Sequence, residues 1–203
     1  MVNAGTANVG SIVNMLKKVG AASVISSDPD AVRKADRLIL PGVGNFDANA
    51  AGLHENGLPD ALREAVLDRA VPFLGICLGM QLLCKGSEEG QLPGMGWIDA
   101  DVVRFPRETA EGPLRVPHMG WNRMRVVREH AVLKELGDSP RFYFVHSYYV
   151  RAHVTSDVLG LCGYGVEFAC AVARENLLAV QFHPEKSHKY GMRLMSNFVG
   201  WAP

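Results

Sequence analysis

The feature that most constrains the fold is an alternation of short apolar runs with stretches of helical periodicity in the first half of the chain. The apolar runs lie at 22–26, 37–41 and 71–76, and each is too short for a buried helix. Helical patterns lie beside them, at 9–19, from 28, at 46–55 and at 59–69. Because short apolar strands that alternate with helices must be covered on both faces, the pattern predicts a mostly parallel sheet in an α/β protein.

From Trp97 onward the pattern changes to strand-like segments separated by turn residues, and a last amphipathic helix is expected at about 188–201. These segments lie at 97–105, 121–127, 141–150, 158–165, 167–175 and 177–183. We therefore expect an α/β fold with a doubly wound, mostly parallel sheet and an antiparallel extension. The chain shows no linker or repeat, so residues 1–203 are expected to form a single domain.

Composition narrows the classes of function. The 21 basic residues balance the 21 acidic residues, which favours neither nucleic acid nor an anionic membrane as a partner. No segment approaches the length of a membrane span. The four cysteines show neither paired metal spacing nor a dense disulfide framework, so we expect a reduced, cytoplasmic protein without a metal or another cofactor.

The segment Gly75-Ile76-Cys77-Leu78-Gly79 places a cysteine between an apolar run and a helical pattern. Ligands of doubly wound sheets bind beyond the carboxyl ends of the strands, where Cys77 is expected to lie. Small residues on both sides permit the tight strand-to-helix turn of a nucleophile elbow, and a following helix directs free N–H groups at the sulfur. A buried cysteine that merely packs is an equally good interpretation of these five residues. Cys84 is expected to be such a core residue.

A cysteine nucleophile needs a general base and a group that orients the base. Of the seven histidines, His183 is distinctive because it ends the apolar run 177–183 and precedes Pro184 and Glu185. Proline stops the strand and fixes the backbone, so the imidazole and the carboxylate project at one edge. Taken alone, the segment is better explained by a strand-end histidine beside a solvated glutamate.

Five motifs in this order, GICLGMQLL, LPGVGNF, VPHMGWN, YFVHSYY and QFHPEKS, resemble the class I (triad) glutamine amidotransferases. Within that family they resemble the glutaminase subunits of imidazole glycerol phosphate synthases, over nearly the whole chain. The resemblance implies a Cys77–His183–Glu185 triad that hydrolyses L-glutamine to glutamate and ammonia through a thioester on Cys77.

The resemblance also implies roles for other residues. Gly42, Val43 and Gly44 would form an oxyanion strand, with the backbone N–H of Leu78 as a second donor. The amino-acid end of glutamine would be held by Gln81, Glu89, His146, Ser147 and Tyr148. An acidic residue suits a charged α-amino group, which makes Glu89 chemically reasonable.

The partner implied by the resemblance is a (β/α)₈-barrel synthase subunit, which uses the ammonia to make imidazole glycerol phosphate and AICAR in histidine biosynthesis. The residues implied to face it are Asn8, Trp121, Asn122 and Lys186. A tryptophan at position 121 is also consistent with a core position.

Three alternatives remain at this stage. A paralogue could supply ammonia for sugar-nucleotide amination in surface-polysaccharide synthesis, a stand-alone hydrolase could act on γ-glutamyl compounds, and a non-catalytic subunit could retain the fold. The start of the sequence also departs from the family pattern, because residues 1–3 leave room for only a very short first strand unless the recorded start is internal.

Overall fold

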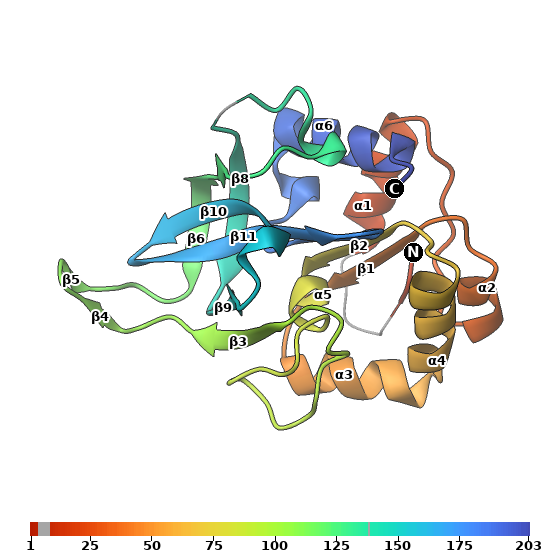
Figure 1. Ribbon diagram of the computed structural model, residues 1–203, viewed down its shortest axis with the longest axis horizontal. Coiled ribbons are helices and arrows are strands. Elements are labelled where there is room, and N and C mark those ends of the chain that lie inside the picture. Colours follow the sequence, from red (N-terminus) through yellow and green to blue (C-terminus); the bar gives the residue numbers. More distant parts are fainter. Residues whose placement is uncertain (4–8, 138) are drawn as a thin grey trace.

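The computed structural model describes residues 1–3, 9–137 and 139–203. Its centre is three parallel strands, β1 (Leu38–Gly42), β2 (Phe73–Cys77) and β12 (Leu177–Val180), with β2 in the middle (Figure 1). All residues of these strands are buried, as expected for strands that are covered on both faces.

Helices cover both faces of this parallel part (Figure 1). On one face, α1 (Val9–Lys18) and α6 (His188–Gly200) pack on Ile39 and Leu74. The other face carries α2 (Pro29–Arg33), α3 (Phe46–Glu55), α4 (Leu58–Arg63) and a π-helical turn (Glu64–Asp68), which pack on Leu40 and Phe73. Because neighbouring residues of a strand point to opposite faces, one sheet supports two apolar cores.

The predicted antiparallel extension is confirmed. Strand β11 (Val166–Arg174) joins it to β12, and β10 (Val158–Tyr164), β7 (Arg125–Val126), β9 (Tyr148–Ala152) and β3 (Ala100–Arg104) complete the eight-stranded sheet. A separate ribbon pairs β6 (His118–Arg123) with β8 (Arg141–His146). The hairpin of β4 (Glu108–Thr109) and β5 (Gly112–Pro113) projects at one end (Figure 1).

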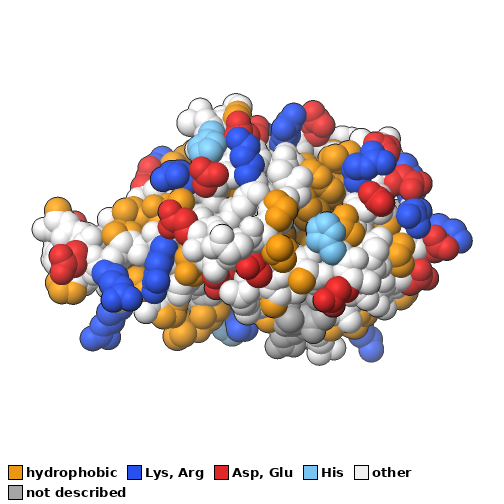
Figure 2. Space-filling view, turned by 90° about the horizontal axis from the view of Figure 1, so that it is seen from below, with side chains coloured by type: hydrophobic (Ala, Val, Ile, Leu, Met, Phe, Trp, Pro, Cys, Tyr) orange, Lys and Arg blue, Asp and Glu red, His pale blue; other side chains and the backbone are white. Residues whose placement is uncertain are grey.

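Single 3₁₀ turns lie at Ala131–Leu133, Thr155–Asp157 and Pro184–Lys186. Among the described residues, no helix is long and apolar enough to cross a membrane. On the face shown in Figure 2, basic and acidic side chains are interspersed, in keeping with the balanced net charge.

Some expected elements differ from the structure. The apolar run 22–26 is no strand: Ser26 makes a single parallel bridge to Val2, and the side chains of Val24 and Ile25 are exposed. Within residues 1–3, the described part of the expected first strand, Val2 donates to the Ile39 carbonyl (2.8 Å) and makes a single bridge. Among the described residues, the backbone of the run 22–26 bonds to Met1 and Asn3 on either side of the bridge, and three residues offer too few partners for a strand.

The helix expected after Cys77 is present but short. Helix α5 covers only Leu78–Gln81, and the next amides, of Leu83 and Cys84, bond three residues back in the manner of a 3₁₀ turn. A four-residue helix has little macrodipole, so only local N–H groups are available to polarise the cysteine.

Candidate active site

The predicted nucleophile lies where the parallel strands end. Cys77 is the last residue of β2, pairs in register with Gly42 of β1, and follows Ile76, which pairs with Val180 of β12. The carboxyl ends of the three strands therefore meet around the sulfur, at the edge where ligands of such sheets bind.

The backbone at Cys77 has the strained geometry of an elbow, with φ 55° and ψ −110°. The neighbouring glycines allow the turn to approach the strands closely. A Cβ on Gly79 would lie 1.9 Å from the Leu40 carbonyl oxygen, and one on Gly75 would lie 2.8 Å from the Gly79 oxygen. Both contacts are shorter than any real carbon contact, which explains why glycines flank the cysteine.

His183 and Glu185 form a buried pair beside Cys77. Nδ1 of His183 lies 2.7 Å from a Glu185 carboxylate oxygen, with side-chain exposures of 3% and 5%. Burial of the ring opposes protonation, but the neighbouring Cys77 and Glu185 outweigh it and raise the pKa of His183 above its ordinary value. The ring is thereby suited to take up a proton from the thiol.

The other ring nitrogen, Nε2 of His183, is buried and has no hydrogen-bond partner within the described part of the chain. Cys77 lies close enough to influence the pKa of His183, but not at full hydrogen-bond geometry. Such contacts are often long before substrate binds and tighten in the reacting complex.

A cavity of about 420 Å³ brings the predicted residues together. Its lining includes residues predicted for the triad, for the oxyanion strand, for the substrate and for the partner surface: Val43, Gly44, Cys77, Leu78, Gln81, Glu89, His146, Ser147, Tyr148, His183 and Lys186. An amino-acid-sized substrate fits a cavity of this volume.

On the predicted oxyanion side, Gly44 has φ +88° and Asn49 of α3 donates to the Val43 carbonyl (3.0 Å). Gly42 lies against the elbow, where a Cβ would be 2.8 Å from the Leu78 Cβ. Leu78 begins α5, so its N–H has no acceptor within the helix and is available to a developing oxyanion.

On the predicted substrate side, Glu89 accepts a hydrogen bond from the Phe46 amide (2.9 Å), and burial is the main cause that raises the pKa of its carboxyl. Gln81 is buried, and its amide nitrogen donates hydrogen bonds to the Tyr148 carbonyl (3.1 Å) and to the side-chain oxygen of Gln181 (3.0 Å). This leaves the amide oxygen of Gln81 as the group that can accept a hydrogen bond from a ligand.

The predicted partner residues gather on the exposed side of the β6–β8 ribbon and beside it. Trp121 is 40% exposed and stacks on His188, with ring centroids 5.3 Å apart. The Lys186 ammonium lies 5.7 Å from the centre of the Tyr143 ring. Trp121 is therefore not a core residue.

Asn122 is only partly available at this surface, because its amide nitrogen donates to a His118 ring nitrogen (3.2 Å) and to the Gly163 carbonyl (3.0 Å). Asn8, also predicted to face the partner, lies outside the described residues.

Comparison with known proteins agrees with this geometry. The family model described as "Glutamine amidotransferase class-I" matches residues 1–200. The chain belongs to the class I glutamine amidotransferases.

Similar curated amidotransferases cover almost the whole chain. One, from Pseudomonas aeruginosa, is 48% identical over 199 residues, 98% of this chain and 97% of that protein, and is named imidazole glycerol phosphate synthase subunit HisH 2. A Methanococcus maripaludis protein with the same name is 46% identical and covers 100% of this chain and 98% of its own length.

A crystal structure described as a glutamine amidotransferase has a TM-score of 0.75 at 23% identity and covers 98% of this chain and 96% of that one. The likeness to this structure confirms the predicted fold class.

Sequence reasoning missed several buried polar residues of this amidotransferase. Gln181 lies two residues before His183, and in an extended segment such residues point to the same side, so its polarity within an apolar run was the available signal. His118 is buried between the rings of Phe144 and Tyr164, which stack on it at 4.8 and 4.1 Å. Burial lowers the pKa of His118 to about 4.

The structure also changes the interpretation of His146. Its ring lines the cavity wall, but both ring nitrogens bond to protein, one to the Tyr148 carbonyl (2.8 Å) and one to His118 (3.1 Å). In this arrangement the ring has no nitrogen to offer to glutamine.

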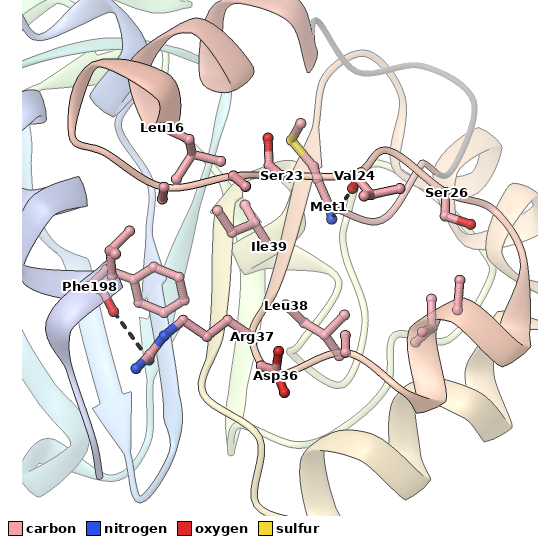
Figure 3. A pocket seen from close by; sticks show the side chains of 16 residues that line it. Met1, Leu16, Ser23, Val24, Ser26, Asp36, Arg37, Leu38, Ile39 and Phe198 are labelled. Carbon is pink, nitrogen blue, oxygen red and sulfur yellow. Dashed lines mark hydrogen bonds between the residues drawn. The ribbon is translucent and has the colours of Figure 1, made fainter.

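A second hollow, of about 530 Å³, lies beside the start of β1 (Figure 3). Its lining is largely apolar, and its one guanidinium, of Arg37, donates to the carbonyls of Phe198 and Trp201. It lies at the amino end of β1, away from Cys77, and contains none of the predicted site residues.

Proposed function

We propose that this amidotransferase is the glutaminase subunit of an imidazole glycerol phosphate synthase, acting in histidine biosynthesis. The observation that carries the chemistry is the placement of Cys77, at a strained elbow, beside the buried His183–Glu185 pair in one cavity. Support for the pathway comes from the two relatives described above, which carry that synthase's name over nearly their whole length.

The reaction follows from these groups. The Cys77 sulfur attacks the carboxamide carbon of glutamine while His183 accepts the thiol proton, and the negative charge moves to the carbonyl oxygen. The N–H of Leu78, together with the segment of Gly42, Val43 and Gly44, stabilises that oxyanion.

When the C–N bond breaks, His183 returns the proton to the departing nitrogen, so ammonia leaves and a thioester joins the glutamyl group to the sulfur. His183 then deprotonates a water molecule that attacks the thioester. Glutamate is released and the thiol is restored. Glu185 keeps Nδ1 of the ring protonated and Nε2 directed at the sulfur throughout.

The amino-acid end of glutamine is held in the same cavity. Glu89 provides a carboxylate for the α-ammonium group, and Gln81, Ser147 and Tyr148 line the wall beside it. Because Glu89 already accepts from the Phe46 amide, one of its oxygens is fixed and the carboxylate has a defined orientation.

The ammonia is delivered to a (β/α)₈-barrel synthase subunit that binds over the surface formed by Trp121, Asn122 and Lys186. An exposed tryptophan and a lysine beside the cavity mouth suit a protein interface, where aromatic anchors contribute much of the binding energy. The synthase-subunit names of the relatives favour this role over a stand-alone hydrolase and over sugar-nucleotide amination.

The chemistry is tested by replacing Cys77 with alanine. We expect loss of glutamine hydrolysis with unchanged folding and unchanged binding of the barrel subunit, because the thiol forms a covalent bond. Cys84→Ala is the matched control: it removes a fully buried cysteine outside the cavity lining, and is expected to lower stability but to retain turnover. Substantial hydrolysis by Cys77→Ala would remove Cys77 from the role.

The pathway is tested by complementation of a histidine auxotroph that lacks its glutaminase subunit, with the cognate barrel subunit co-expressed. Growth is expected for the parent protein and not for Cys77→Ala. Absence of growth despite a stable complex and measurable glutaminase activity would contradict the histidine assignment.

A further inference from the structure

Gln181 is the buried polar residue nearest the end of β12. It follows Val180, which pairs with Ile76, so Gln181 and Cys77 are neighbours just beyond the last paired residues of two parallel strands. Its side chain is fully buried, and its amide nitrogen lies 3.7 Å from the Cys77 sulfur, a normal length for an N–H···S hydrogen bond. A buried amide has to be hydrogen-bonded, and this one spends its donor on the predicted nucleophile.

The direction of this contact is fixed by a second buried amide, that of Gln81. Gln81 donates its amide nitrogen to the Gln181 side-chain oxygen at 3.0 Å, so the nitrogen of Gln181 must face the sulfur. The same nitrogen of Gln81 donates to the Tyr148 carbonyl at 3.1 Å. Both amide groups are thereby held in single orientations.

Two neutral histidines extend the chain of hydrogen bonds toward the surface. A carbonyl oxygen only accepts, so Nδ1 of His146 donates to Tyr148 (2.8 Å). In a neutral ring the other nitrogen then accepts, which requires Nδ1 of His118 to donate to it (3.1 Å). Nε2 of His118 finally accepts from Asn122 (3.2 Å).

Burial favours the neutral form of both rings. It lowers the pKa of His146 to about 3 and that of His118 to about 4. Neutral rings with one donor and one acceptor each fix the direction of hydrogen bonding from Asn122 as far as the Tyr148 carbonyl, which accepts from both His146 and Gln81. The network is therefore consistent at every link.

We propose that Gln181 is a positioning residue of the glutaminase: its side-chain N–H holds the Cys77 sulfur at the cavity wall, and Gln81, which is oriented by the Tyr148 carbonyl, fixes the orientation of Gln181. This inference rests on the proposed function, because it assumes that Cys77 is the nucleophile. An N–H donor bonds more strongly to a charged sulfur than to a neutral thiol, so Gln181 favours the form that attacks glutamine. Gln181 and His183 reach the sulfur from the same short segment that follows β12.

The test replaces the amide while keeping the volume. Gln181→Met removes the donor, and Gln181→Glu keeps an acceptor for Gln81 but places oxygen against the sulfur. The readout is the rate at which iodoacetamide alkylates Cys77 as a function of pH, with the modified peptide identified by mass spectrometry. Gln91→Met, which makes the same chemical change at an exposed position, is the matched control.

Alkylation reports on Cys77 specifically. The other three cysteines are buried, and burial raises the pKa of Cys84 and of Cys162 to about 12 and that of Cys170 well above its ordinary value. Only a thiolate reacts appreciably, so these thiols stay silent at neutral pH.

We expect the pH midpoint of alkylation to move upward by roughly 0.5–1 unit in Gln181→Met and further in Gln181→Glu, as suits the loss of one hydrogen bond to a charged group. The value of kcat for glutamine should fall about tenfold, with a smaller change in KM, since Gln181 is not in the cavity lining. The Gln91→Met protein should match the parent in both measurements.

An unchanged alkylation profile in a folded Gln181→Met protein would overturn the inference. If circular dichroism shows that this variant does not fold, Gln81→Leu, which frees the Gln181 amide to rotate, must show the same upward shift, and an unshifted profile there would also overturn it. Failure of the proposed function would give a different result. The parent protein, once alkylated at Cys77, would still hydrolyse glutamine, whatever the alkylation profiles of the Gln181 variants.

Discussion

The buried rings of His118 and His146 should make the fold sensitive to acid, and a single substitution should reduce that sensitivity. In the unfolded chain a histidine titrates near 6.5, whereas burial lowers the pKa of His146 in the folded protein to about 3. The unfolded state therefore takes up a proton as the pH falls through 6.5, and the native state does not until about 3. Stability contributed by the neutral ring is complete above 6.5 and is lost progressively as the pH falls through this window.

The magnitude of the lost stability follows from how far the pH lies below 6.5, the ordinary pKa of histidine. Each pH unit is worth about 1.4 kcal/mol per group, so lowering the pH from about 7.5 to about 5 costs about 2 kcal/mol at His146 alone. His146 is almost fully buried, so solvent screening does little to reduce this figure. His118, with its pKa lowered to about 4, adds a loss of the same sign.

The measurement is urea unfolding at a series of pH values on three proteins: the parent, His146→Gln and the control His54→Gln. Glutamine can donate to the Tyr148 carbonyl and accept from His118, but it does not titrate. We expect His146→Gln to be less stable than the parent at about pH 7.5, yet to lose about 2 kcal/mol less on acidification to about pH 5. His54 lies exposed on α3, so its variant should follow the parent.

Comparison between variants cancels the titration of every other group, including His183, whose raised pKa acts in the opposite direction. The reasoning is refuted if His146→Gln and the parent lose the same free energy between the two pH values, since the native ring would then take up its proton as readily as the unfolded one.

Three further outcomes are expected. Glu185→Gln should lower kcat by about 10²–10⁴-fold with little change in thermal stability, because His183 loses the group that fixes its tautomer; near-normal turnover would count against the pair. Gly79→Ala should destabilise the fold by about 3 kcal/mol in chemical denaturation, since its Cβ would meet the Leu40 oxygen at 1.9 Å, while Gly10→Ala on α1, with open space around it, should stabilise slightly. The isolated chain should hydrolyse glutamine weakly, and the barrel subunit with its acceptor should raise the rate; full activity without the partner would contradict this coupling.

Local sequence predicts a strand correctly where an apolar run is buried on both faces, because no other element suits such a short run. The runs 37–41 and 71–76 became β1 and β2 because both faces of each are buried between helices. The run 22–26 has a similar composition, but among the described residues its backbone pairs only with residues 1–3. The sequence of a run does not indicate how many partner residues the fold will place beside it.

The ribbon of β6 and β8 shows the same limit for side chains. Met119 is 62% exposed although its side chain is apolar, because one face of the ribbon is left uncovered. His146 was expected at the substrate, and it does line the cavity, but one of its ring nitrogens bonds to His118 on the paired strand, 28 residues earlier. Motif order predicted which residues meet in the cavity, but not which of their atoms are already engaged by other side chains.

The position of β12 has a consequence for how the enzyme is made. It is the last strand along the chain, yet it lies between β2 and β11, so these two strands cannot be joined until the final quarter of the polypeptide has been synthesised. Until then β2 has an unpaired edge, which is where a nascent sheet is most open to wrong pairing. Insertion of β12 closes that edge and, in the same event, brings His183 to Cys77. A growing chain therefore brings Cys77 and His183 together only when β12 has joined the two parts of the sheet.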